Sequence, residues 1–204
     1  MERTLSESPR LATAMKDWPH NTEILRANGY YSGMWGNPAA AMKRGREVHA
    51  AVHILTAGAE IDDAWIQRHQ DYLGYILGAQ KWLAEHKVEL LEKEYLIECK
   101  SERYVTTLDQ VDVVDGYPAI VEIKTGSRPN AIELQTGGQK RALRLQNSLN
   151  ATLRMSSALV ARFMLLLPGD GTYKFEKFTD PRDEEEFVLL CRGWWVNQRR
   201  GLNG

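Results

Sequence analysis

The chain has 204 residues, enough for one domain with a well-buried core. Its 26 Lys and Arg against 27 Asp and Glu give a formal net charge of −1, so no overall basic field indicates nucleic acid, and such a partner would need a local basic patch. The two cysteines, Cys99 and Cys191, are too few for a disulfide scaffold or for the four ligands of an iron–sulfur cluster.

The amino terminus is polar and lacks the apolar segment of a signal peptide. The most apolar run, ALVARFMLLLP, is broken by Arg162 and is too short to cross a bilayer. We therefore expect a cytoplasmic protein that does not act at a membrane. A single domain is expected over residues 1–204, with a mainly helical part at 1–88, a sheet with one inserted helix at 89–179, and a C-terminal helix at 180–204.

Helical patterns fill the amino-terminal half. A weak helix is expected in the first stretch to about Tyr31, ended near the segment DWPH. The segment NPAAAMKRGREVHAAVHILTAG predicts a clearer helix, with Asn37 as cap, Pro38 at the first position and Gly58 at the end. Apolar residues in EIDDAWIQRHQDYLGYILGAQKWLAEHK recur near a 3.6-residue period, so the helical region continues there.

From about Leu90 the pattern becomes extended. Strands are expected in LLEKEYLIECKS, RYVTTLDQVDVV and YPAIVEIKT, and two more in RFMLLLP and TYKFEKF around a GDG turn. Helices are expected in RPNAIELQTGGQKRALRLQNSL and in DPRDEEEFVLLCRGWWVNQRR, the second with Asp180 as its cap. This order predicts an α/β fold in which helices surround a mixed sheet.

The Asp-Gly pair at residues 115–116 is the strongest hairpin signal in the sequence. A two-residue loop there sets a register in which Asp109 lies opposite Glu122 and on the same face. Lys124 shares that face because side chains two apart on a strand point the same way. Asp112 projects to the other face, so the predicted working set is Asp109, Glu122 and Lys124.

Two neighbouring carboxylates repel unless a cation or a proton lies between them. Asp109 and Glu122 therefore predict a site for Mg²⁺ or Mn²⁺, which prefer oxygen ligands and keep waters that a substrate can displace. Such an ion polarises a phosphoryl oxygen, and Lys124 can orient the attacking water or stabilise transition-state charge, so phosphodiester hydrolysis is the expected chemistry. The alternative is a solvated hairpin face, but AIVEIKTG is an apolar strand whose charges coincide at Glu122 and Lys124.

The segment TLDQVDVVDGYPAIVEIKTG resembles the core of the PD-(D/E)XK nuclease superfamily, in particular its RecB-like, phage-type exonuclease branch. GREVH resembles the Gly-x-x-x-His helix motif of that branch, LEKEYLI lies where the branch often has a Glu, and LQTGGQKRAL resembles its Gln-x-x-x-Tyr helix. The order and spacing match from about Gly45 to Leu143. The resemblance implies a restriction-endonuclease-like core with a helical N-terminal part.

The resemblance also implies roles for individual residues. It implies that a metal ion is bound by the carboxylates of Asp109 and Glu122, the backbone carbonyl of Ile123 and the imidazole of His49. Lys124 is then expected to serve the attacking water, Glu94 to support the metal or the water, and Gln135 to position the strand. Gln139 stands where the family has tyrosine, but both glutamines lie on one helical face and can contact the DNA backbone.

Basic residues follow the predicted catalytic strand in GGQKRALRLQNSLNATLR. Three of them are predicted to bind DNA phosphates beside the metal site: Lys140, Arg141 and Arg144. A solvated helix face is the competing interpretation of this run.

Two further patterns have simpler interpretations. His49 and His53 have the spacing of a zinc site, but no Glu adjoins them as in a zinc-protease helix and no third ligand is evident. Trp194 and Trp195 are expected to pack the last helix rather than to stack on bases.

These inferences predict a divalent-metal-dependent DNA exonuclease that acts on single- or double-stranded ends in recombination, repair or phage DNA processing. The expected cofactor is Mg²⁺ or Mn²⁺, without an iron–sulfur cluster. A structure-specific or restriction-like endonuclease is one alternative, because the same site cuts internal bonds when its groove is open. A catalytically silent DNA-binding module in recombination is the other. A recombination partner protein and an oligomer are both compatible with the sequence.

Overall fold

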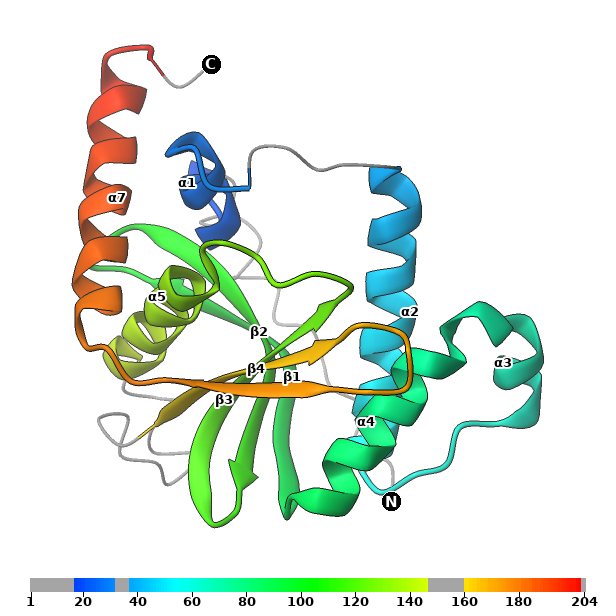
Figure 1. Ribbon diagram of the computed structural model, residues 1–204. Coiled ribbons are helices and arrows are strands. Elements are labelled where there is room, and N and C mark those ends of the chain that lie inside the picture. Colours follow the sequence, from blue (N-terminus) through cyan, green and yellow to red (C-terminus); the bar gives the residue numbers. More distant parts are fainter. Residues whose placement is uncertain (1–16, 32–36, 147–159, 203–204) are drawn as a thin grey trace, which may run out of the picture.

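A five-stranded sheet lies between two layers of helices in the computed structural model, which describes residues 17–31, 37–146 and 160–202 (Figure 1). The strand order is β1-β2-β3-β4-β5, and every neighbouring pair is antiparallel except the parallel pair β3 and β4. The strands are β1 (Val88–Cys99), β2 (Tyr104–Val114), β3 (Tyr117–Thr125), β4 (Ala161–Leu167) and β5 (Lys174–Phe178). The predicted mixed sheet with flanking helices is confirmed.

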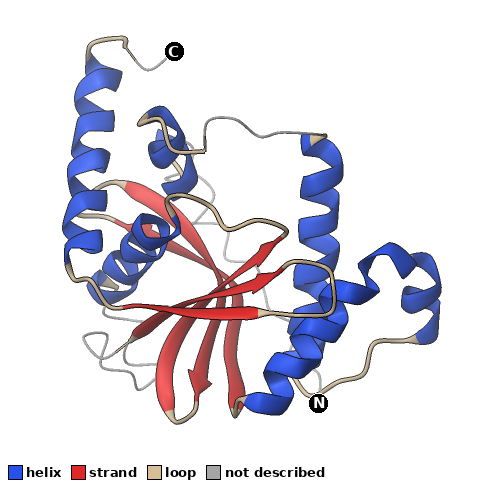
Figure 2. Ribbon diagram, in the orientation of Figure 1, coloured by secondary structure: helices blue, strands red, loops and turns tan. Residues whose placement is uncertain are grey.

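The helices divide between the two faces of the sheet (Figure 2). One layer contains α1 (Asn21–Ala27), α5 (Ile132–Leu145) and α7 (Arg182–Arg199), and the other contains α2 (Pro38–Thr56) and α4 (Leu73–Glu85), with α3 (Asp63–Arg68) and the short 3₁₀ helix η2 (Gln70–Tyr72) between them in sequence. None of the helices in the described segments is long and apolar enough to span a bilayer.

The helix ends test the predicted caps. The Asn37 side chain accepts hydrogen bonds from two backbone N–H groups at the start of α2, as predicted. The cap position of α7 falls on Pro181 rather than on Asp180, although the Asp180 carboxylate accepts a hydrogen bond from the Arg182 N–H. Two parts of the predicted helices, residues 1–16 of the first and residues 147–149 of the helix after β3, lie outside the described residues.

The first described helix, α1, begins after the segment DWPH, and the stretch before that segment, in which a helix is predicted, lies outside the described residues. The start of α1 has a capping box, in which the Glu23 carboxylate accepts a hydrogen bond from the His20 backbone N–H at 2.7 Å. This arrangement satisfies a donor that a helix start otherwise leaves unpaired, and it marks residue 20 as a beginning.

The β2–β3 hairpin has the predicted two-residue loop. Asp115 and Gly116 have positive φ angles of 52° and 86°, as a type I′ turn requires at both central positions. Val114 pairs with Tyr117, and the ladder continues in that register. The Asp115 carboxylate also accepts a hydrogen bond from the Lys87 N–H at 2.9 Å, which holds the turn against the start of β1.

Two apolar cores result from the alternation of side chains along the strands. Ile120 of β3 packs into the core beneath α5 and α7, whereas Val121 and Ile123 pack into the core beneath α2 and α4. Because both faces of β3 are covered, a charged side chain on this strand is removed from water. The structure therefore buries Glu122 and leaves Lys124 partly exposed.

We expect replacement of Gly74, at the start of α4, to destabilise the protein. A Cβ atom at this position would overlap the backbone carbonyl of Gly169, whereas a Cβ at Gly193 of α7 would meet nothing within 4 Å. Gly74→Ala should lower the free energy of unfolding by about 1–3 kcal/mol through overpacking. Gly193→Ala, the matched control, should raise it by up to about 1 kcal/mol through helix propensity. Urea denaturation followed by circular dichroism measures both; equal stabilities would contradict the tight contact.

Candidate active site

Three acidic residues lie in one row across β1, β2 and β3. The pairs that flank Glu94 and Asp109 are in register, so these two acids are opposite each other. On the other side of β2 the last ladder pair, Gln110 with Val121, directs Asp109 toward Glu122. The ladder ends before Asp109 and Glu122 form a pair, so the predicted register brings the two acids near each other without the direct pairing that the sequence predicts.

Asp109 lies where β2 and β3 separate. One of its oxygens, Oδ2, accepts a hydrogen bond from the Ile123 N–H at 2.8 Å, and the other, Oδ1, lies 3.7 Å from Nδ1 of His49. Burial raises the pKa of the Asp109 carboxyl well above its usual range, and the neighbouring Glu122 charge raises it further. Burial also lowers the pKa of His49 to about 4, so its imidazole is neutral at pH 7, the form that binds metals.

The structure brings three potential metal ligands together. His49, Glu94 and Asp109 each offer one ligand atom, and these atoms lie within 4.8 Å of one another. Two carboxylate oxygens and one imidazole nitrogen suit a divalent cation such as Mg²⁺ or Mn²⁺ when water completes its shell. Among the described residues, the sequence-predicted metal ligands His49 and Asp109 are thus joined by Glu94, which was predicted to have a supporting role.

The Glu94 backbone is strained. Its φ angle of 46° lies in the left-handed region, which costs energy for a residue with a side chain. A bulge between Leu90 and Glu92 interrupts β1 shortly before this position. His53 also approaches Glu94, with Nε2 4.0 Å from Oε1, but it is not in the three-ligand group. The geometry therefore favours a site with one histidine over the two-histidine zinc alternative.

Glu122 is held differently from Asp109. It is 3% exposed, and its Oε1 atom accepts hydrogen bonds from the Lys124 amine at 2.7 Å and the Gln135 amide at 2.5 Å. Its Oε2 atom accepts from the Gln139 amide at 2.6 Å. Three donors thus compensate for the burial of this carboxylate. The carboxylates of Asp109 and Glu122 interact electrostatically, but their hydrogen bonds reach different helical layers.

Lys124 remains a cation in this environment. Burial alone lowers its pKa, but the charges of Glu122 and Asp109 outweigh burial, so the pKa of Lys124 is raised above its usual range. A protonated amine donates hydrogen bonds and stabilises negative charge, and it cannot remove a proton from water. The chemistry available to Lys124 at neutral pH is therefore electrostatic.

The two glutamines of α5 share one helical face, as predicted, and this face points to Glu122. Gln139 also donates to the Thr107 carbonyl at 3.0 Å, near the place where β2 leaves β3. The Tyr31 hydroxyl donates to Oε1 of Gln135 at 2.8 Å, which directs the amide N–H₂ of Gln135 to Glu122. Sequence reasoning missed Tyr31, because it lies 104 residues before its partner and no local pattern connects them.

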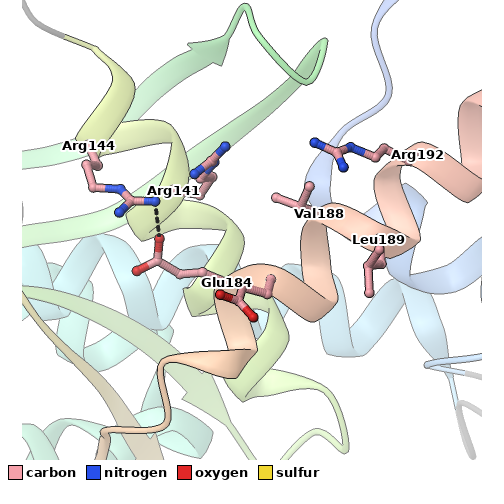
Figure 3. Close-up of a pocket in the computed structure, with 7 residues that line it drawn as sticks. Arg141, Arg144, Glu184, Val188, Leu189 and Arg192 are labelled. Atoms are coloured by element: carbon pink, nitrogen blue, oxygen red, sulfur yellow. Dashed lines mark ion pairs between the residues drawn. The ribbon is translucent and has the colours of Figure 1, made fainter.

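The predicted phosphate-binding residues of α5 lie against α7 (Figure 3). Arg144 and Lys140 pair with Glu184 at 3.1 Å and 3.8 Å, and Arg141 pairs with Glu102 at 3.0 Å. Arg141, Arg144 and Glu184 line a groove of about 350 Å³ between the two helices. Since each of the three cations already has an acidic partner, this arrangement favours helix packing, and their contact with DNA stays a prediction.

Two clefts meet at the candidate site. One, of about 700 Å³, is lined by residues that include Tyr31, Arg44 and Lys124, and by His49. The other, of about 570 Å³, is lined by His49 together with His53 and Glu94. His49 borders both clefts, so a ligand in either would lie beside at least one of the three potential metal ligands. The larger volume lies within the usual range of ligand-binding sites.

The mixed sheet between two helical layers has the arrangement of a restriction-endonuclease-like core. The crystal structure of a putative exonuclease from Eubacterium rectale shares this fold, with a TM-score of 0.52 and 12% identity over 99% of this chain and 88% of its own. LHK-Exo in complex with dAMP is more weakly similar, with a TM-score of 0.40 and 14% identity over 94% and 92% of the two chains. No protein-family model and no curated protein sequence matches.

Asp112 generates a prediction about pH. It points toward the α2 layer, is fully buried, and neither carboxylate oxygen has a hydrogen-bond partner among the described residues. Burial raises the pKa of the Asp112 carboxyl to about 8, from its usual value of 3.8 in an unfolded chain. Between these values the folded chain binds more protons than the unfolded chain, so stability falls as pH rises through this range.

Asp112→Asn should therefore raise the free energy of unfolding more at pH 8 than at pH 5, because the neutral amide avoids the buried charge. Urea denaturation at both pH values measures this. A substitution effect that is the same at the two pH values would show that Asp112 does not titrate in this range in the folded chain.

The metal site makes a second prediction. Asp109→Asn should weaken Mn²⁺ binding by more than about tenfold, because loss of a ligand exceeds the usual effect of altering an outer-shell contact. Asp112→Asn is the matched control, since it makes the same chemical change three positions away on β2, at a carboxylate that does not belong to the three-ligand group. Isothermal titration of each variant with Mn²⁺ gives the affinities. Equal losses in the two variants would place the ion elsewhere.

Proposed function

We propose that the chain is a divalent-metal-dependent deoxyribonuclease that hydrolyses phosphodiester bonds at DNA ends. The observation that carries the proposal is the row of Glu94, Asp109 and Glu122 beside a half-buried, protonated Lys124. The fold shared with a putative exonuclease supports a nuclease without specifying its substrate. A role in recombination, repair or phage DNA processing belongs to the same proposal and rests on the sequence resemblance.

The donor set fits a hard divalent cation. His49, Glu94 and Asp109 would hold it. Glu122 is not in this group, and both of its carboxylate oxygens accept hydrogen bonds from Lys124 and α5, so its place in the metal shell, like that of the Ile123 carbonyl, stays a prediction. Bound Mg²⁺ or Mn²⁺ would supply Lewis-acid activation of a phosphate oxygen and of a water molecule. A cation would also relieve the repulsion between the neighbouring carboxylates, which at present raises the pKa of Asp109.

The protein groups around this set would then have separate tasks. Lys124 would direct its N–H groups to the charge that develops on the phosphate in the transition state. Gln135 and Gln139 would hold the Glu122 carboxylate in place, because each donates an amide N–H to it. Tyr31 would maintain the orientation of the Gln135 amide. Such pre-organised donors need no rearrangement when the reaction begins.

The alternative of a silent DNA-binding module is less consistent with these groups. Charged groups at low exposure reduce stability unless they are compensated, and phosphate binding by a surface patch does not require them. Glu122 is 3% exposed and Asp109 is 8% exposed, so each carboxylate loses hydration on folding, and a purely binding protein could replace both with apolar residues. A catalytic site, by contrast, needs these carboxylates for its chemistry.

The proposal predicts cleavage of end-labelled linear DNA in Mg²⁺ or Mn²⁺, with closed circular DNA left intact. Lys124→Ala should reduce the rate by about a hundredfold or more, the usual cost of removing one transition-state donor. Lys174→Ala on β5 is the control, because that lysine is exposed and distant in the sheet from the acidic row. Gel electrophoresis of both substrates measures the rates.

Each outcome of that experiment has a clear meaning. Cutting of the circle would make the protein an endonuclease with the same site. An absence of cleavage by folded protein in every divalent ion tested would reject the catalytic proposal and leave the DNA-binding module.

A further inference from the structure

Arg44 occupies a distinct position in the larger cleft. It projects from α2, and its Nε atom lies 3.5 Å from the Oγ1 atom of Thr125, at the end of β3. Its guanidinium carbon lies 5.7 Å from the centre of the Tyr75 ring, within the range of a cation–π contact. These contacts hold the side chain beside Lys124, which lines the same cleft.

The charges of this cleft are unevenly compensated. Arg128 binds the carboxylates of both Glu133 and Glu176, and Lys124 binds Glu122. Arg44 lines the same cleft without a carboxylate partner in the described part of the chain, and it is half-buried. A guanidinium has five N–H donors in a planar fork that matches a phosphate, and the contacts with Thr125 and Tyr75 leave most of them available.

The distance between Arg44 and the candidate metal site can be estimated from the backbone lengths of β3 and α2. His49 and Ile123 line the same cleft, and Arg44 contacts Thr125, two residues further along β3. Two strand residues span about 6.6 Å, and the five residues from His49 back to Arg44 span about 7.5 Å along α2. These two lengths agree with each other, and both are comparable to the separation of neighbouring phosphates in a nucleic-acid strand.

We propose that Arg44 binds the DNA phosphate adjacent to the one that is cleaved. This inference rests on the proposed nuclease function, because it takes the cleaved phosphate to lie at His49 and Asp109. In this arrangement Arg44 fixes the direction of the strand through the cleft, and its planar fork contacts two oxygens of a single phosphate. Lys140, Arg141 and Arg144, which already have acidic partners, are not needed for this contact.

The test compares Arg44→Ala and Arg44→Lys with the control Lys43→Ala. Lys43 is the preceding residue of α2, is exposed, and does not line the cleft, so its replacement removes the same charge from the same helix. The probe is a dye-labelled single-stranded oligonucleotide in Ca²⁺, and fluorescence anisotropy at several salt concentrations gives its dissociation constant. Cleavage in Mg²⁺ or Mn²⁺ is measured separately on the same proteins.

Arg44→Ala should weaken binding by about tenfold and reduce the slope of log affinity against log salt by about one, because one phosphate contact is lost. Arg44→Lys should recover part of the affinity, since it keeps the charge without the fork. Lys43→Ala should bind as the native chain does. With a probe whose phosphate next to the cleaved bond is an uncharged methylphosphonate, the Arg44→Ala loss should disappear.

The inference and the proposed function fail in different ways. Equal binding by the native chain and Arg44→Ala, with cleavage retained, would overturn the role of Arg44 and leave the nuclease. A loss of binding in Arg44→Ala in a protein that cleaves DNA under no condition would support the phosphate contact and reject catalysis. Native protein that does not bind the probe would overturn the inference. If Arg44→Ala does not fold, judged by its thermal unfolding, Arg44→Lys provides the comparison.

Discussion

The buried carboxylate of Glu122 constrains how α5 packs on the sheet. A charge at 3% exposure needs donors, and two of its three come from glutamines four residues apart on α5. The residues between them include Gly137 and Gly138, where a Cβ would collide with Asp183 of the α7 start and with Phe187. One face of α5 is thus fixed by hydrogen bonds to Glu122 and the other by close contact with α7.

The site opens where β2 and β3 part, and side chains replace the missing ladder bonds there. The Asp109 carboxylate accepts the hydrogen bond of the Ile123 N–H, and the Gln139 amide donates to the Thr107 carbonyl. A buried backbone group that leaves a sheet without a new hydrogen-bond partner costs about 1–3 kcal/mol of folding stability. The residues that would perform the chemistry therefore also stabilise the opening in which they lie, which restricts their movement.

The sequence predicts those parts of the structure that depend on local rules. The Asp-Gly turn sets a register that aligns Asp109 with Glu122, and Asn37 marks the start of α2. The contacts of Tyr31 with Gln135 and of Arg44 with Thr125 span 104 and 81 residues, so only tertiary packing reveals them. Helical periodicity likewise does not distinguish a solvated basic face of α5 from one that packs against the acids of another helix.

The net charge of −1 does not show how the fold distributes its charges, some of which are paired while others are not. The basic residues of α5 pair with Glu184 in the first turn of α7, where an acid also complements the helix dipole. In the cleft, by contrast, Arg44 has no acidic partner among the described residues. If the protein acts on DNA as proposed, this arrangement would neutralise few phosphates, so counterion release would contribute little to its affinity for DNA. Binding that leads to cleavage would then depend on the metal and on the fit of one strand in the cleft. Non-specific binding to duplex DNA would be weak.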